Sequence, residues 1–312
     1  MASLLGRQFS FEAIGTQWTL DIWTNTEESA LQELLQSVHQ RIEQFDQRYS
    51  RFRADSWVSE VAAAAGSYAL PVDAEPLLHV YDELFRLSDG SITPLIGGLL
   101  EQAGYDAEYS LAEKSGFAEQ IAPKWQQAVT YADGQLQVSE PVVLDFGAAG
   151  KGYLVDQISE LLEAAGITQY CVDASGDMRY RHPRQVPLRV GLENPFAQQQ
   201  VIGVVELTEG SLCASSGNRR RWGTHHHIMD AQTKRSPEDI AATWVVAPRA
   251  LEADALATAL YLVSPDILEQ AFSFEYLILY DGYRVQRSDD FPVELFTASS
   301  RPHETQKGEI PA

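Results

Sequence analysis

The sequence predicts an α+β (or α/β-like) protein in which helices pack on mixed sheets. Segments of strand length alternate between apolar and polar residues, and amphipathic helical patterns lie between them. At 312 residues, the chain is long enough to bury a large core, in one domain or in two closely packed lobes. We expect one domain over residues 1–296. Residues 297–312 lack apolar periodicity and are predicted to be a disordered tail.

The first half of the chain predicts a hairpin followed by three helices. Residues 8–23 alternate well enough to be a strand or hairpin, with Gly15 as a bulge. Apolar residues then recur at helical spacing, and Thr26 or Asn25 is the expected cap of the first helix. The expected elements are a helix over 27–45, a loop over 46–56, a short helix over 56–65, a helix over 76–87 ending near Asp89-Gly90, and an irregular segment over 93–120.

The second half predicts short strands around two further helices. An Asp133-Gly134 turn joins two of these strands. The central helix ends at Gly166, and Pro248 opens the last helix, which runs to about residue 263. The expected strands are 128–131, 136–138, 169–172, 188–192, 201–207, 243–247 and 276–281.

Composition excludes several classes of function. The formal charge of -21 argues against nucleic acid or an anionic membrane as a partner, because phosphate binding needs a basic surface. Two cysteines, Cys171 and Cys213, form no disulfide framework or metal pattern and are expected to be buried thiols. No secretory signal or membrane-spanning segment is recognisable, so a cytoplasmic location is the expectation unless a leader precedes this sequence.

The most informative stretch is VVLDFGAAGKGYLVD, residues 142–156. It reads as a strand, a loop of small residues, Lys151 and the start of a helix. Small residues let a ligand approach the backbone, and peptide N–H groups that open a helix favour an anion. The spacing matches neither the Rossmann fingerprint nor a P-loop. A tight turn without a ligand would give the same pattern, so both interpretations stay open here.

A second stretch, ADALATAL, places Asp254 and Thr258 four residues apart on one helix face. Such hard oxygens suit Mg²⁺, which needs one or two protein groups when phosphate and water complete its shell. The structural alternative is a packed helix whose threonine bonds to a carbonyl one turn earlier.

A third stretch combines SSGNRRRW with THHHIMD. One guanidinium of Arg219–Arg221 can reach a phosphate. Zinc is disfavoured, because at most His225 and His227 would share a strand face. One inward histidine as a proton carrier or a ligand contact is the better interpretation, with the other two in an exposed loop.

Together, LDFGAAGKGYLVD, ADALATAL, SSGN, HHIMD, AIGTQW, FDQRYSRFRADSWVSEV and DASGD resemble the ApbE-like FAD:protein FMN transferases over roughly residues 10 to 280. The resemblance implies an ApbE-like (T-fold-related) architecture. It implies transfer of FMN from FAD to a threonine or serine of an acceptor protein, with Mg²⁺ stabilising the charge as AMP leaves.

The resemblance also implies roles for individual residues. Mg²⁺ would be held by the Ala148 carbonyl and by the side chains of Asp254 and Thr258. His227 would sit near the reacting phosphate as a candidate base. The expected FAD contacts are Asp145 and Lys151, the flavin-lining Ile14 and Phe52, and the segment Ser91, Ile92 and Thr93.

The chain departs from the family pattern around the ligand. The segment 92–95 reads Ile-Thr-Pro-Leu without the family's carboxylate, and HIMDAQTKRS lacks its Pro and Gly. Many relatives carry an export leader, which would imply a periplasmic location. Two alternatives follow: an enzyme that hydrolyses FAD to FMN and AMP, and a flavin-binding protein without turnover. Retention of Lys151, Asp254 and Thr258 together favours an enzyme.

Overall fold

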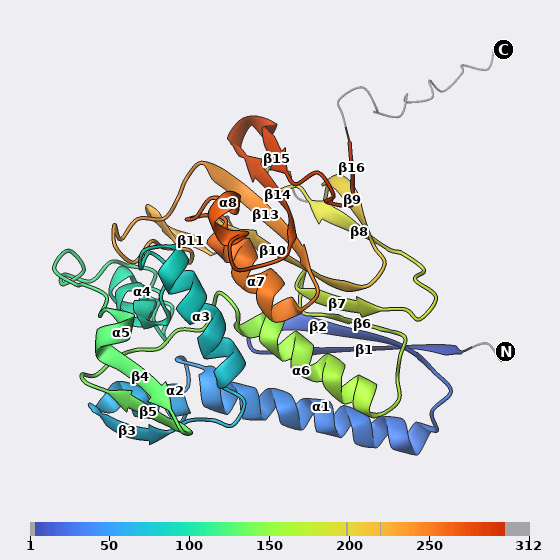
Figure 1. Cartoon of the computed structure of the whole chain (residues 1–312), viewed down its shortest axis with the longest axis horizontal. Helices are drawn as coiled ribbons and strands as arrows, with labels where there is room; N and C mark the ends of the chain where they lie inside the picture. Colours follow the sequence, from blue (N-terminus) through green and yellow to red (C-terminus); the bar gives the residue numbers. More distant parts are fainter. Residues whose placement is uncertain (1–3, 198, 219, 297–312) are drawn as a thin grey trace, which may run out of the picture.

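The computed structural model describes residues 4–197, 199–218 and 220–296 (Figure 1). Its largest sheet has eight strands in the order β1-β2-β6-β7-β10-β13-β14-β15. Every pairing in it is antiparallel, and helices pack on it, which confirms the α+β prediction. The strands are β1 (Leu5–Ala13), β2 (Thr16–Thr24), β6 (Tyr170–Asp173), β7 (Met178–Arg181), β10 (Gly210–Ser216), β13 (Ile240–Ala247), β14 (Glu275–Tyr280) and β15 (Val285–Arg287).

The predicted hairpin is present as β1 and β2, but Gly15 is not a bulge. The strands pair one to one up to Ala13 and Thr16, so Ile14 and Gly15 form a two-residue turn. Both residues have positive φ, 44° and 74°, as a turn of type I′ requires. A positive φ is unusual for a β-branched side chain such as Ile14. The alternating pattern continues on both sides of Gly15, so the sequence alone could not distinguish a bulge within one strand from a turn between two strands.

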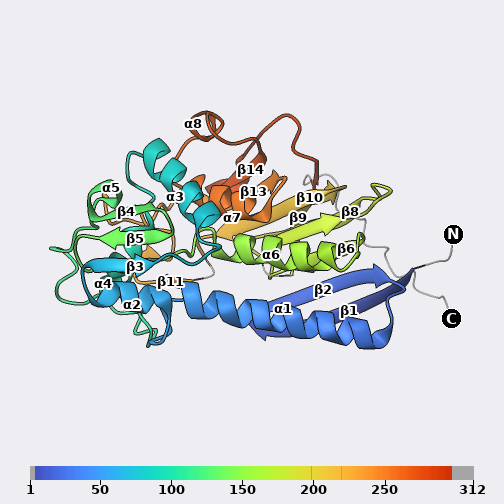
Figure 2. The same ribbon diagram turned by 60° about the horizontal axis from the view of Figure 1, so that its bottom comes forward.

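Helices cover one face of the large sheet. Figures 1 and 2 show α1 (Glu28–Tyr49) lying beside α6 (Gly150–Ala164), and α7 (Ala250–Ala259) packs between α6 and the strands β10 and β13. Gly152 permits the contact between α6 and α7, because a Cβ there would lie 2.0 Å from the Ala250 carbonyl oxygen. Side chains from these helices and from one face of the strands form the main core.

Several helix boundaries differ from the predictions. The first helix continues to Tyr49, into the predicted loop, and no side chain caps its start. The last long helix begins at Ala250, after Pro248, and ends at Ala259. The segment predicted to be irregular contains α4 (Gly97–Ala103). The other helices are α2 (Trp57–Ala63), α3 (Glu75–Leu87), α5 (Trp125–Ala128) and α8 (Pro265–Leu268), with 3-10 turns at Pro94–Ile96 and Asp281–Tyr283.

Smaller sheets complete the described fold. The sheet β16-β9-β8 encloses a second core on the other face of the large sheet, where Trp244 and Leu277 point. The predicted strands are found except for the one before the central loop, and β3, β7, β10, β11, β12, β15 and β16 were not anticipated because they are short or carry polar residues. The strands of the smaller sheets are β3 (Gly66–Ala69), β4 (Val129–Ala132), β5 (Gln135–Val138), β8 (Leu188–Glu193), β9 (Val201–Leu207), β11 (Arg221–Trp222), β12 (His225–His226) and β16 (Val293–Leu295).

The strand predicted before the central loop is not formed. Residues 141–146 belong to none of the sheets, although Val142 and Leu144 are buried. The Asp145 N–H donates to the Pro94 carbonyl (2.7 Å), so the segment is held by single contacts instead of a ladder. The apolar run was predicted to be a strand because its side chains are buried, but burial alone does not distinguish a strand from an irregular buried segment.

Further expectations concern the two cysteines, membrane-spanning helices and the C-terminal tail. Cys171 and Cys213 are both free and buried, as predicted. In the described part of the chain, no helix is long and apolar enough to cross a membrane. The predicted disordered tail, residues 297–312, lies outside the described residues, as does Arg219.

Candidate functional site

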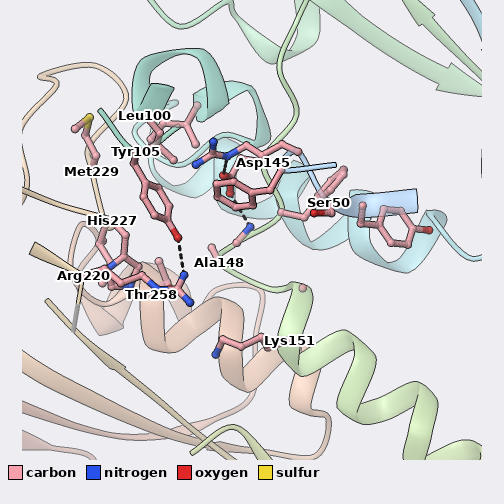
Figure 3. A pocket seen from close by; sticks show the side chains of 18 of the residues that line it. Ser50, Leu100, Tyr105, Asp145, Ala148, Lys151, Arg220, His227, Met229 and Thr258 are labelled. Atoms are coloured by element: carbon pink, nitrogen blue, oxygen red, sulfur yellow. Dashed lines mark hydrogen bonds and ion pairs between the residues drawn. The ribbon is translucent and has the colours of Figure 1, made fainter. Parts of the chain in front are cut away.

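A cavity of about 450 Å³ opens where the C-terminal end of α1, the loop before α6, the helix α7 and the β11–β12 hairpin meet. Figure 3 shows Ala148, Lys151, Thr258, Arg220 and His227 around this space. The structure thus brings together residues far apart in sequence. The predicted site residues that line the cavity are Ile14, Phe52, Ser91, Ile92, Thr93, Asp145, Ala148, Lys151, His227 and Thr258.

Asp254 lies next to the cavity, behind Lys151. Its Oδ2 accepts a hydrogen bond from the Gly152 N–H (2.8 Å), and its Oδ1 lies 3.9 Å from the Lys151 Nζ. Asp254 is 2% exposed, and this burial raises the pKa of its carboxyl group. The predicted pairing of the central loop with α7 is therefore present in the structure.

Asp177 is a part of this group that sequence reasoning missed. Its carboxylate forms an ion pair with Lys151, and its Oδ1 accepts a hydrogen bond from the Ala214 N–H (3.3 Å). Asp177 is 1% exposed. The available signal was the DASGD segment, which follows a predicted strand and ends in this carboxylate. Asp177 and Asp254 thus place two buried carboxylates around one lysine.

Thr258 faces the cavity from α7, one turn after Asp254. Its Oγ1 lies 3.2 Å from the Ser215 Oγ of β10, so the hydroxyl is held across the helix–sheet contact. Ala148 also lines the cavity, and its N–H donates to the Tyr81 hydroxyl (3.3 Å). Asp254 and Thr258 lie on one helix as predicted, where Asp254 contacts α6 and Thr258 contacts β10.

The donor set fits a hard cation. A carboxylate, a hydroxyl and a main-chain carbonyl are the oxygen ligands that Mg²⁺ accepts when phosphate and water supply the rest. Two buried carboxylates against one lysine also leave a net negative charge, which a cation would offset. Among the described residues, no group of three or more His, Cys, Asp or Glu side chains is arranged to hold a metal alone.

Arg51 was not predicted as a site residue, although it precedes Phe52. Its Nε lies 2.5 Å from the Asp145 Oδ2, and its guanidinium packs 4.2 Å from the centre of the Phe52 ring. The other carboxylate oxygen of Asp145 accepts from the Gly147 N–H (2.7 Å). Asp145 therefore links the buried guanidinium of Arg51 to the backbone of the small-residue loop and fixes the loop's shape.

The three histidines have different environments. His227 lines the cavity, and its Nδ1 has no hydrogen-bond partner among the described residues. Burial, with Arg220 as the next cause, lowers the pKa of His227 to about 3. The predicted exposed loop for the other two is wrong. His225 lies 3.2 Å from Glu113, and the Nε2 of His226 lies 2.8 Å from the Pro237 carbonyl oxygen; both side chains are buried.

The segment Ser91–Thr93 follows α3 in the chain and lines the cavity. The Ser91 hydroxyl donates to Asp230 (3.3 Å), and the Thr93 hydroxyl accepts from the Leu95 N–H (3.1 Å), which caps the following turn. These bonds give Ser91 and Thr93 a structural role within the cavity wall. Sequence matching alone could not separate that role from a ligand contact.

Comparison with known proteins places these features in a family context. The ApbE family model matches residues 14–275. The FAD:protein FMN transferase of Escherichia coli (strain K12) is 24% identical over 306 residues, covering 90% of this chain and 86% of that protein. Its counterpart in Rhodobacter capsulatus is 30% identical over 210 residues, covering 64% of this chain and 40% of that protein.

Solved structures share the fold. The flavin transferase ApbE from Vibrio cholerae superimposes with a TM-score of 0.81 at 20% identity, covering 92% of this chain and 98% of that one. The ApbE protein of Thermotoga maritima gives a TM-score of 0.80 at 21% identity, covering 93% and 100%. At these identities the superposition establishes the architecture.

Proposed function

This chain belongs to the ApbE family, and we propose that it is an FAD:protein FMN transferase that attaches FMN to a threonine or serine of an acceptor protein. One observation carries the proposal: Lys151 and Thr258 line one cavity with His227, and Asp254 lies directly behind Lys151. These residues come from α6, α7 and the segment after β12, so the fold assembles them.

The cavity has the chemistry that a dinucleotide requires. Its wall carries aromatic rings at Phe52, Tyr105 and Tyr109, which offer surfaces for a planar ring system. Its other side carries the small loop, a lysine and oxygen donors, where a pyrophosphate can approach the backbone. An apolar pocket with a few convergent polar groups is typical of such ligand sites.

We propose Mg²⁺ as the cation of this site, held by the Asp254 carboxylate, the Thr258 hydroxyl and the Ala148 carbonyl. When bound, it neutralises charge on the pyrophosphate and on the departing phosphate. The protein's own part is to hold these oxygens in place: the Gly152 N–H fixes Asp254, and Ser215 fixes Thr258.

In the proposed reaction, the acceptor hydroxyl oxygen bonds to the FMN phosphorus, and the bond from that phosphorus to the AMP phosphate oxygen breaks. The bonding pair leaves with AMP. The hydroxyl proton passes to the neutral imidazole of His227, whose Nδ1 has no hydrogen-bond partner within residues 4–197, 199–218 and 220–296. Burial is the main reason for the low pKa of His227, and the nearby charges of Arg220 and Lys151 lower it further. An anionic pyrophosphate would offset those charges and make the imidazole a stronger base.

The test is incubation with FAD, Mg²⁺ and a candidate acceptor protein, followed by denaturing electrophoresis. Flavin fluorescence that stays with the acceptor supports the transferase. Free FMN and AMP without labelled acceptor would indicate FAD hydrolysis, and unchanged FAD would indicate a binding protein. A parallel reaction with EDTA tests the metal, because labelling without any divalent cation would contradict its assignment.

A further inference from the structure

The basic side chains that line the cavity differ in their charge balance. Arg51 is paired with Asp145, Arg53 with Asp46 (3.0 Å), and Lys151 with Asp177. Arg220 is different. In the part of the chain that the structure describes, no carboxylate oxygen lies within 4.0 Å of its guanidinium. It therefore contributes a positive charge to the cavity that these protein groups do not neutralise.

Arg220 is nevertheless held in place. Its Nη1 donates to the Tyr105 hydroxyl (2.7 Å), as Figure 3 shows, and the buried Tyr105 ring stacks against Trp222 at 5.7 Å between centres. The Arg220 carbonyl also accepts a hydrogen bond from the His227 N–H (3.2 Å). The backbone and one end of the guanidinium are thus fixed, while the guanidinium still has other N–H groups to offer.

The position of Arg220 relates it to the proposed reaction centre. Arg220 lines the cavity together with Thr258, Ala148 and Lys151, and in the view of Figure 3 its guanidinium lies near Thr258 and Ala148 and above Lys151. The charge of Arg220 also affects His227: burial is the main cause of the lowered pKa of His227, and Arg220 is the next. A fixed guanidinium without a counter-ion is suited to phosphate oxygens, which it can bind through two parallel hydrogen bonds.

We propose that Arg220 binds a phosphate oxygen of the FAD pyrophosphate and stabilises the charge that develops during FMN transfer. This proposal rests on the proposed function. Arg220 remains protonated throughout, because the bonding pair leaves with AMP and the acceptor proton goes to a separate base. Tyr105 is a positioning residue that orients the guanidinium. Lys151 cannot supply this charge fully, because it is already balanced by buried carboxylates.

The test compares Arg220→Gln with Arg221→Gln. Arg221 is the next residue, is exposed, lies 3.8 Å from Glu238 and does not line the cavity. Binding of FAD and of riboflavin, which has no phosphate, is measured by flavin fluorescence in the presence of Mg²⁺. For Arg220→Gln we expect the Kd for FAD to rise roughly tenfold to a hundredfold, as for a lost hydrogen bond to a charged group. Its Kd for riboflavin should stay within about twofold of the wild-type value, and Arg221→Gln should change neither.

Two further variants separate charge from position. Arg220→Lys keeps the charge and should recover part of the FAD affinity but not the bidentate contact. Tyr105→Phe should weaken FAD binding less than Arg220→Gln does. The double variant should be no weaker than Arg220→Gln alone, because Tyr105 acts through that arginine. A double variant whose losses simply add would contradict this positioning role.

Equal losses of FAD and riboflavin affinity would show that Arg220 supports packing, and would overturn the proposal. Unchanged FAD affinity in Arg220→Gln would overturn it as well. These results are distinct from failure of the proposed function. A wild-type protein that binds FAD but labels no acceptor counts against the transferase, whereas an Arg220→Gln variant that binds FAD and labels acceptor normally counts only against this arginine.

Discussion

The floor of the cavity and its aromatic wall are built in different ways. The floor consists of Lys151 and Thr258, backed by the buried carboxylates of Asp177 and Asp254, and these polar groups are bonded to one another or to neighbouring backbone and side chains. The wall consists of Phe52, Tyr105, Tyr109 and Arg220.

The wall is more open than the floor. Phe52 is 37% exposed and Tyr109 is 53% exposed, and the two rings stack at 5.6 Å. Buried charges must be paired, and Lys151 already lies against the two carboxylates, so the floor groups are held in position before a ligand arrives. Exposed aromatic surface is more typical of a binding face. Substitutions in or behind the floor should therefore affect stability and the chemistry, and substitutions in the wall should affect binding.

The largest expected effect comes from the buried contact between Asp156 of α6 and the start of α7, which holds the two helices of the floor together. Asp156 of α6 is fully buried and accepts hydrogen bonds from the Ala250 and Leu251 N–H groups (both 3.0 Å) at the start of α7. It also pairs with Arg179 (2.7 Å). Asp156→Ala should lower the free energy of unfolding by about 3 kcal/mol, since donors and a cation lose a buried partner.

Urea denaturation followed by circular dichroism measures this loss. Glu160→Ala is the matched control, because Glu160 lies one turn later on α6 and makes a surface contact of 3.5 Å with Arg249. That control should change the free energy of unfolding by less than about 0.5 kcal/mol. Equal stability of Asp156→Ala and wild type would show that the floor does not depend on this junction.

The next prediction concerns the floor itself. Asp254→Ala removes a carboxylate that faces Lys151 and the Gly152 N–H, and we expect metal-dependent FMN transfer to fall at least roughly 100-fold while the fold persists. Asp254→Asn keeps the volume and should be almost as inactive, since it lacks the charge. Transfer rates at saturating FAD and Mg²⁺ measure this, and wild-type rates in either variant would refute the cation site.

The wall gives a smaller and different effect. Phe52→Ala removes an aromatic face at the cavity mouth, and we expect FAD and riboflavin affinities to fall together by roughly tenfold, as stacking contributions of this kind suggest. The transfer rate at saturating FAD should change little. Phe52→Tyr keeps the ring and serves as the control. A variant that loses transfer rate but keeps its flavin affinity would contradict the division between wall and floor.

The sequence predicted the floor better than the wall. Asp254 and Thr258 sit one turn apart in a small-residue helix, and Lys151 follows a small-residue loop, so local spacing carries this information. The predicted residues converge because Gly152 lets α6 and α7 approach closely. Asp177 was missed because its partner Lys151 lies on α6, and only the tertiary fold brings the two together.

The sequence predicts that one guanidinium of Arg219–Arg221 can reach a phosphate, but the contacts that bring Arg220 to the cavity wall leave no local pattern. Arg220 becomes a cavity residue through its bond to Tyr105, which lies more than a hundred positions earlier in a segment predicted to be irregular. The expected strand before Asp145 failed for a related reason. Apolar periodicity reports burial, and burial without a neighbouring strand produces no sheet. Element types were therefore more predictable than the partners of individual polar groups.

His227 lies where floor and wall meet, and its titration tests whether that junction is as dry as the floor. Burial lowers the pKa of His227 to about 3, whereas a histidine in the unfolded chain has a pKa of about 6.5. Between these two pH values the imidazole is neutral in the folded protein and protonated in the unfolded chain. The unfolded state then binds more protons, and the free energy of unfolding falls as the pH decreases through the interval between these two values. From pH 6 to pH 5, this group should account for a loss of about 1 kcal/mol in the free energy of unfolding.

The His227→Gln variant should lose that much less stability than the wild type across the same interval. The control His79→Gln, which replaces an exposed histidine on α3, should lose as much stability as the wild type. Urea denaturation at both pH values gives the difference. If His227→Gln and wild type lose the same stability, water reaches the imidazole in the folded protein, and the junction belongs with the open wall.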